Sequence, residues 1–305
     1  MGRVAIGRLS MPARRALWAY LFLLPWLLGL GLFWVGPLLA SLFFSLTEYD
    51  VLSPPRFVGL ANYRRALLED NLFWPSLGLT LRYSLVVVPL GLVGSLLLAA
   101  LLNRGLPGTN LFRTCFFLPH LTPAVALALL WTWLFHPTVG PINLALGAVG
   151  LEGPGWLASE SWALPALILI TLWGQVGGNG MLIFLAGLQG VPEPMIDAAK
   201  IDGAGAWARF RHIVVPMISP TILFNLILGV IAALKVFTLA FVATKGGPQY
   251  ATWFLALHIY NQAFEYFRMG FASALAWLFV AMLLVFTYVQ LKLSNRWVYY
   301  AGEAD

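Results

Sequence analysis

Six long stretches of this sequence carry no charged residue, and they constrain the fold more than any other feature. In chain order they lie between Arg15 and Glu48, Arg82 and Arg104, Arg113 and Glu152, Glu160 and Glu193, Arg211 and Lys235, and Arg268 and Lys292. A helix needs about 20 mainly apolar residues to cross a bilayer. Only 10% of the residues are charged, against about 25% in a soluble domain. We therefore predict an all-α integral membrane protein with six transmembrane helices, forming a single domain over residues 1–305.

The first and third of these stretches need interpretation. The first follows a basic N-terminus, as in a signal peptide, but it is too long and has no small-residue cleavage site, so we expect a retained helix. The third exceeds one span and is broken by Pro137, Gly140 and Pro141. We predict that its helix ends near Phe135 and that an external loop follows.

The distribution of Lys and Arg predicts the topology, because cytoplasmic loops carry an excess of both. An N-terminus on the inside places most of them in the cytoplasm, including the basic residues before Ala16. Both termini are then cytoplasmic, with residues 1–16 as the cytoplasmic N-terminus. Two segments between spans are long, an external one at 48–76 and a cytoplasmic one at 189–216. The net charge of +6 is explained by this topology and not by binding of nucleic acid.

The cytoplasmic segment has the pattern of a helix, a glycine turn and a second helix. Glu193 and Pro194 begin the first helix, and Gly203 ends it. The second helix is predicted from Ala204 to about Val214, ending before Pro216. Asp197 and Lys200 are spaced i,i+3, as in an ordinary surface ion pair. The small Ala198 and Ala199 favour instead a close approach by another protein, and spacing alone leaves both interpretations open.

The same segment resembles the EAA motif of binding-protein-dependent ABC importer permeases. The matching residues are Asp197, Ala198, Ala199, Asp202, Gly203, Ile213 and Pro216. Asp197 replaces the usual Glu and keeps the carboxylate on a shorter arm. Residues 57–80, 162–193 and 235–252 are also similar to motifs of the sugar-type permeases of the maltose and glycerol-phosphate group, with Thr238 in place of an Asp.

The resemblance implies a type I ABC importer transmembrane domain that transports sugars, such as di- or oligosaccharides or related polyols. Such a chain forms half of an alternating-access pathway in a bacterial inner membrane, beside a second permease subunit and among membrane lipids. Its coupling helices, here with Asp197, Ala198, Ala199, Asp202 and Gly203, dock on a dimer of ATPase subunits. A solute-binding protein delivers substrate from outside.

The sequence offers no ATP site of its own. It contains no G-x-x-x-x-G-K-[ST] motif and no Gly-Lys dipeptide. We therefore expect a chain that is not an enzyme and holds no cofactor, with ATP and Mg²⁺ bound by the partner ATPase.

Two groups of residues are candidates for the substrate pathway. Gln175 and Asn179 are spaced i,i+4 on the fourth predicted helix, so they are expected to share a face. Polar residues within a span mark pathways, although they also join packed helices. On the fifth predicted helix Lys235 is the sole charged residue, with Phe237 and Thr238 close by and Asn225 earlier on the same helix. Lys235 either faces the pathway or extends to the membrane surface. Asn225 is more typical of helix packing.

Two other classes of membrane protein are disfavoured. One is a membrane-embedded enzyme, which would need His, Asp or Glu clustered at the membrane face, and the sequence places no such cluster there. An ion-coupled secondary transporter or channel, the alternative function, usually needs a carboxylate inside a span, and every Asp and Glu lies outside the predicted spans. Metal chemistry has no support, because the histidines are scattered with no ligand spacing and no acidic residue nearby in the sequence. These histidines are His120, His136, His212 and His258.

Overall fold

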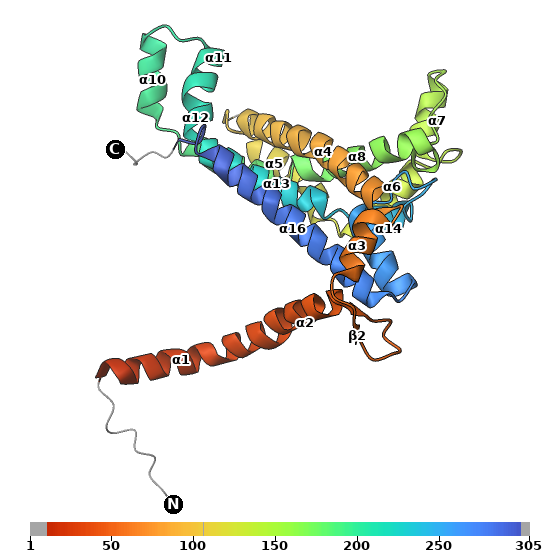
Figure 1. Ribbon diagram of the computed structural model, residues 1–305. Coiled ribbons are helices and arrows are strands. Elements are labelled where there is room, and N and C mark those ends of the chain that lie inside the picture. Colours follow the sequence, from red (N-terminus) through yellow and green to blue (C-terminus); the bar gives the residue numbers. More distant parts are fainter. Residues whose placement is uncertain (1–10, 106, 300–305) are drawn as a thin grey trace, which may run out of the picture. The chain divides into compact units, whose positions relative to one another are not determined.

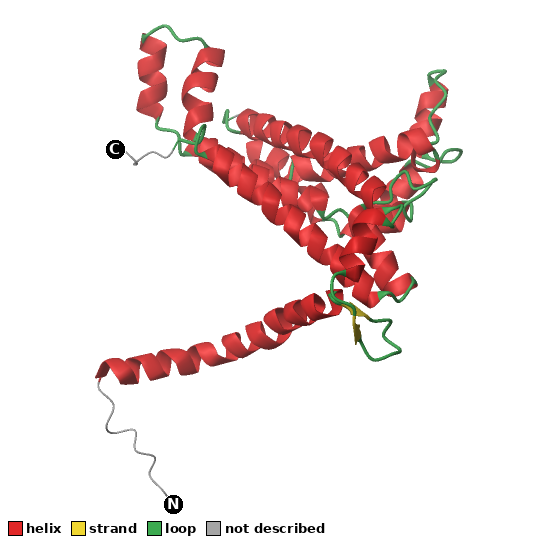
Figure 2. Ribbon diagram, viewed as in Figure 1, coloured by secondary structure: helices red, strands yellow, loops and turns green. Residues whose placement is uncertain are grey.

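The computed structural model describes residues 11–105 and 107–299. Most of them are helical, and Figure 2 shows one small antiparallel pair of strands, β1 (Thr47–Glu48) and β2 (Arg56–Phe57). The chain divides into two compact units. One comprises the chain up to Leu68 together with Gln262–Trp277, and the other comprises Glu69–Asn261 and the chain from Leu278 onward. The single domain expected for the whole chain stays a prediction.

The first unit begins with a long apolar helix and continues into a small folded module. Its helical elements are α1 (Met11–Leu30), the π-helix η2 (Gly31–Val35), α2 (Gly36–Ser45), α3 (Ala61–Leu68), the π-helix η5 (Asn261–Glu265) at the boundary, and the start of α16 (Met269–Ser294). Asn62 donates from Nδ2 to the carbonyls of Ser45 and Thr47, at 3.0 and 2.8 Å. These bonds attach α3 to the chain that follows α2. Residues 1–10 of the expected cytoplasmic segment 1–16 lie outside the described residues. The rest of that segment belongs to α1, which begins at Met11.

The module lies in the segment predicted to be an external loop at 48–76. Asp50 accepts a hydrogen bond from the backbone N–H of Ser53 at 2.8 Å, and this bond lowers the pKa of the Asp50 carboxyl. The Gly270 N–H donates to the carbonyl of Tyr49 at 3.0 Å. The predicted loop therefore contains ordered structure, held by both local and long-range hydrogen bonds.

The second unit is a bundle in which α4 contacts α8, α9 and α13. Buried residues recur at every fourth position of α4, which places them on one face: Tyr83, Val87, Gly91, Ser95 and Ala99. The last three are small, so neighbouring helices approach closely there. The helices of this unit are α4 (Phe73–Leu102), α5 (Thr109–Leu121), α6 (Ala124–Leu134), α7 (Pro141–Ala148), the 3₁₀ helix η3 (Trp156–Ala158), α8 (Glu160–Val176), α9 (Asn179–Gln189), α10 (Glu193–Ile201), α11 (Ala206–Arg209), the π-helix η4 (Phe210–Val214), α12 (Val215–Met217), α13 (Ser219–Leu234), α14 (Thr238–Ala243), α15 (Leu255–Tyr260) and the later part of α16.

The candidate membrane spans are partly continuous and partly broken. Within the described residues, four helices are long and apolar enough to cross a membrane: Trp18–Ser45, Phe73–Leu102, Ser219–Ala243 and Met269–Ser294. Two pairs of consecutive helices are bent at a short break, α5 with α6 by 95° and α8 with α9 by 41°. Each pair adds one candidate span if its two helices cross the membrane together. The chain thus has four to six candidate spans, and the count of six stays a prediction.

Three predicted helices differ in detail from the structure. The helix expected to end near Phe135 is broken at Thr122, because Pro123 disfavours a helical residue before it, and Thr122 is extended. α4 begins at Phe73, so Arg82 lies inside it and not before it. The fifth predicted helix is interrupted at residues 235–237. Asn225 and Thr238 therefore lie on separate helical segments, contrary to expectation.

The segment predicted at 189–216 forms a helical hairpin that projects from one end of the bundle, whereas α7 and α14 lie at the opposite end (Figure 1). Its first arm, α10, has the predicted start at Glu193. The predicted end of the second arm before Pro216 is wrong, because the helix continues through η4 and α12 to Met217. Pro216 lies within α12, directly after the π-helical segment η4, so the helical arm continues through this proline. The chain leaves this arm at Ile218, directly before α13.

Candidate functional site

A cavity of about 190 Å³ lies among α4, α8, α9 and α13 in the second unit. Most of its lining is apolar, but five polar side chains also face it: Ser95, His120, Gln175, Asn179 and Asn225. A concave, mainly apolar site with a few polar groups is the usual form of a ligand site. Since these groups come from four candidate membrane segments, the cavity is the strongest candidate for a solute pathway in this chain.

Gln175 and Asn179 both line this cavity, but not for the reason that their spacing suggested. The helix expected to carry both is broken between them, since α8 ends at Val176 and α9 begins at Asn179. Gly177 allows this break to pack tightly, because a Cβ there would lie 2.0 Å from the carbonyl oxygen of Phe116 on α5. The break therefore brings α5 and its His120 to the cavity. The role of both amides in substrate contact stays a prediction.

Asn225 was expected to serve in helix packing, and its role stays a prediction. It is buried on α13 and lines the cavity, and its Nδ2 has no hydrogen-bond partner in the described part of the chain. An unpaired buried amide costs about 1–3 kcal/mol, so it has a strong tendency to bind a solute or water oxygen. Its position inside a span was the available signal.

The second group of predicted pathway residues does not line this cavity. Lys235 is exposed at the end of α13, and Thr238 begins α14. Phe237 stacks on Phe241, with ring centroids 5.3 Å apart, and also contacts the Tyr260 ring at 5.1 Å. The structure therefore separates these three residues from Gln175 and Asn179. Their part in the pathway stays a prediction.

The predicted coupling residues form an exposed surface at the end of the hairpin. Lys200 Nζ donates to Asp197 Oδ1 at 2.8 Å, which confirms the expected pair. Asp202 follows α10, and Gly203 adopts φ +80°, a conformation that favours glycine. The Ala204 N–H donates to the Ala199 carbonyl at 2.9 Å and closes the turn.

Two large apolar residues add to this surface, and sequence reasoning did not single them out. Ile201 is 87% exposed and Trp207 is 70% exposed. They lie on either side of the Gly203 turn in the sequence. Both side chains enlarge the apolar part of the exposed surface at the end of the hairpin.

A second buried polar group lies near the opposite end of the bundle. Trp253 Nε1 donates to His258 Nδ1 at 3.2 Å, so His258 carries its proton on Nε2 and donates it to Asp70 Oδ2 at 2.8 Å. His258 is fully buried. The sequence has no acidic residue directly beside His258, and Asp70 reaches it in the structure from a distant part of the sequence. Within residues 11–105 and 107–299, no three metal-ligating side chains gather.

Comparisons with known proteins identify the family. Residues 91–299 match the family described as "Binding-protein-dependent transport system inner membrane component". The chain is 38% identical to the probable ABC transporter permease protein YesP of Bacillus subtilis (strain 168), over 94% of this chain and 93% of that protein. It is 34% identical to the sn-glycerol-3-phosphate transport system permease protein UgpA of Yersinia pestis, over 95% and 99%. It is 30% identical to the probable starch degradation products transport system permease protein AmyD of Thermoanaerobacterium thermosulfurigenes, over 93% and 96%.

Solved structures share the fold. A chain in the crystal structure of a bacterial ABC transporter involved in the import of the acidic polysaccharide alginate superposes with a TM-score of 0.82 at 22% identity, covering 93% of this chain and 96% of that chain. A chain of the same kind of transporter, in complex with an alginate pentasaccharide-bound periplasmic protein, gives a TM-score of 0.83 at 22% identity over 95% and 98%. The resemblance read from the 197–216 motif is thus confirmed, and this multi-pass membrane chain belongs to the family of binding-protein-dependent transport system inner membrane components.

Proposed function

We propose that this chain is one of two membrane subunits of an ATP-driven importer for sugars or related polyols. The observation that carries the proposal is the cavity with five polar side chains, which α9 connects directly to the exposed hairpin. The names of relatives support the substrate class, since they include permeases for starch degradation products and sn-glycerol 3-phosphate. They favour this function over an ion-coupled secondary transporter or channel.

The hairpin is the proposed coupling element. Asp197, Ala198, Ala199, Asp202 and Gly203 dock on one subunit of an ATPase dimer, which binds ATP and Mg²⁺ because this chain has no phosphate-binding loop. α9 is 11 residues long, or about 16 Å, and runs from Asn179 at the cavity to within four residues of α10. A displacement of the hairpin therefore shifts a wall of the cavity. The chain itself carries out no enzymatic reaction.

The cavity is the proposed substrate contact. The amides of Gln175 and Asn179 provide donors and acceptors for sugar hydroxyls, and the unpaired Nδ2 of Asn225 provides a further donor. Lys235, Phe237 and Thr238 form a second part of the pathway, at the interruption between α13 and α14. Alternating access then requires that the second permease subunit, in a heterodimer, complete the wall that this chain leaves open.

The remaining proposals concern topology and outer partners. The chain crosses a bacterial inner membrane six times as a type I importer domain, with both termini in the cytoplasm. A solute-binding protein docks on the external segment at 48–76 and on the turn that contains Lys245. A solved complex with a periplasmic protein supports this kind of partner.

Coupling is tested by comparing two neighbouring glycines. Gly203 has φ +80° and Gly205 has φ −64°, and a Cβ at either position meets no atom within 4 Å. Gly203→Val therefore strains the backbone of the turn, whereas Gly205→Val does not. We expect the ATPase subunits to co-purify with the Gly205→Val chain but not with the Gly203→Val chain, with both chains still inserted in the membrane. Equal co-purification of both variants would refute the coupling role.

A further inference from the structure

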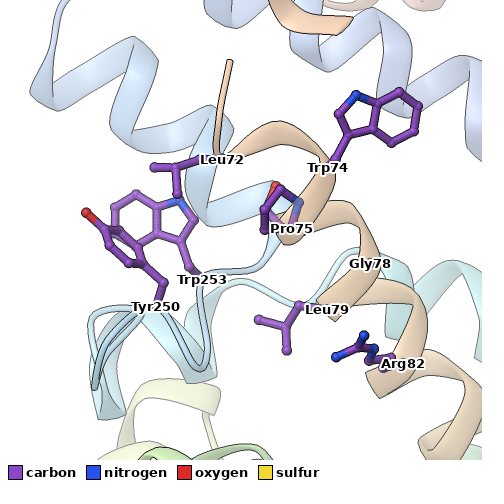
Figure 3. A pocket seen from close by; sticks show the side chains of 9 residues that line it. Leu72, Trp74, Pro75, Gly78, Leu79, Arg82, Tyr250 and Trp253 are labelled. Carbon is purple, nitrogen blue, oxygen red and sulfur yellow. The ribbon is translucent and has the colours of Figure 1, made fainter. Parts of the chain in front are cut away.

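A second cavity, of about 330 Å³, lies between the first turns of α4 and the chain at 250–253. Figure 3 shows Tyr250 and Trp253 on one side of it, with Pro75 and Leu79 of α4 facing them and the guanidinium of Arg82 at its lower end. No carboxylate lines it. The cavity therefore combines aromatic rings with one cationic group.

This cavity is separate from the candidate solute pathway. Arg82 is exposed on α4, whereas Gly91 and Ser95, which line the pathway cavity, are buried. A helix turns by about 100° per residue, so Arg82 and Gly91 lie about 180° apart on α4. The ligand of the Arg82 cavity is therefore not a solute within that pathway.

The position of Arg82 along α4 places its guanidinium at a membrane surface. Residues 83–103 carry no charge, and Arg82 and Arg104 bracket them. A span needs about 20 such residues to cross the hydrocarbon of a bilayer. α4 has 30 residues and is about 45 Å long, so it is longer than the hydrocarbon of a bilayer, which is about 30 Å thick. The turns that precede Arg82 account for the extra length. Arg82 thus lies at the level of the lipid headgroups.

The chemistry at this level is that of a phosphate site. Within the described residues, no Asp or Glu lies within ion-pair distance of Arg82, and the planar guanidinium matches two phosphate oxygens. Trp and Tyr prefer the headgroup region, and here Trp253 is held in place by His258, which Asp70 orients. The lining of this cavity also has no carboxylate that would repel an anionic headgroup.

We propose that the Arg82 cavity binds the phosphate of an anionic membrane lipid of the phosphatidylglycerol class, in the leaflet nearest α7. This site is independent of the proposed sugar transport. It holds one lipid headgroup on the face of α4 that faces away from the pathway cavity.

The test is a titration of the purified full chain in detergent, followed by native mass spectrometry that counts bound lipids. We expect wild type to bind one phosphatidylglycerol at least about fivefold more tightly than phosphatidylcholine. A basic residue at the surface contributes about 1 kcal/mol to attraction of anionic lipid, so Arg82→Gln is expected to weaken that step about fivefold. Arg82→Lys keeps the charge and is expected to lose less. Arg56→Gln, an exposed arginine on β2 outside every candidate span, is the matched control and is expected to bind as wild type does.

Three outcomes would overturn the proposal. In the first, Arg82→Gln binds phosphatidylglycerol as tightly as the Arg56→Gln control. In the second, excess soluble glycerol phosphate displaces the lipid, which shows that the ligand is a free phosphate compound. In the third, Arg82→Gln leaves lipid binding intact and weakens association with a second permease, which shows that this face is a protein interface. An unchanged melting temperature for each variant excludes misfolding as the cause of lost binding.

Discussion

The helical hairpin and the cavity lined by Gln175, Asn179 and Asn225 are joined by α9, but they are assembled in different ways. The hairpin comes from one continuous stretch of chain, α10 to α12, and its key residues are exposed. The cavity takes its polar side chains from α4, α5, α9 and α13 and from the end of α8, and Ser95 and Asn225 are buried. The hairpin should therefore tolerate most substitutions without loss of stability, whereas the cavity and its supports should not. The predictions below test this difference.

The largest effect is expected where two helices approach at the cavity. Gly177→Val places a Cβ about 2.0 Å from the Phe116 carbonyl oxygen, so α5 and the α8–α9 break must separate. We expect a loss of unfolding free energy of about 3 kcal/mol, measured by denaturation in detergent. Gly174→Val is the control, because a Cβ there meets Leu127 at an ordinary 3.7 Å. Equal stability of the two variants would show that the break is not tightly packed.

The next effect concerns the buried Trp253–His258–Asp70 group. His258→Ala leaves the indole N–H and the Asp70 carboxylate without their shared partner. The expected destabilisation is about 2–3 kcal/mol, from the unpaired polar groups. His212→Ala on the exposed hairpin is the comparison and should change stability by less than about 0.5 kcal/mol. A similar small change in both variants would contradict the structural role of His258.

A smaller effect is expected for ligand contact in the cavity. Gln175→Ala and Asn225→Ala each remove one hydrogen-bonding amide, worth about 1–1.5 kcal/mol, or about tenfold in apparent affinity. The measurement is ATP hydrolysis by the assembled transporter as a function of loaded binding protein. Gln189→Ala, at the exposed end of α9, is the control. If both cavity variants respond as this control does, the two amides serve only in packing.

The smallest effect is expected on the hairpin. Asp197→Ala removes a surface pair with Lys200, which contributes less than about 1 kcal/mol to stability. Stability should stay unchanged while the affinity for the ATPase subunits falls, as measured by co-purification. Asp197→Glu keeps the carboxylate and is expected to retain binding. A stability loss in Asp197→Ala as large as that of Gly177→Val would remove the distinction between hairpin and cavity.

The hairpin was predictable because its signals are local. Pro194 in the first turn, Gly203 with a positive φ and the i,i+3 pair of Asp197 and Lys200 all act over a few residues. The error at Pro216 is also local. A π-helical segment precedes Pro216 and lets the helix continue through it, and π-helical segments have no clear sequence signal.

The cavity was only partly predictable. Gln175 and Asn179 were found because polar residues are costly inside a span. Their helix was wrongly expected to be continuous, since the packing of α5 against Gly177 is not encoded near that glycine in the sequence. The sequence did not place His120 and Asn225 at the cavity either, because their positions there depend on the packing of helices that are distant in the sequence.

The sequence by itself determined the class of molecule. Charge-free stretches require membrane helices, because a buried charge is too costly in lipid, and the motif around Asp197 identifies the family. Only the tertiary structure decided that Asp70 meets His258, that Gln175 and Asn225 line one cavity, and which face of α4 presents Arg82. Hydrophobicity and local turns depend on neighbours in the chain, whereas these contacts depend on how distant helices bend and pack.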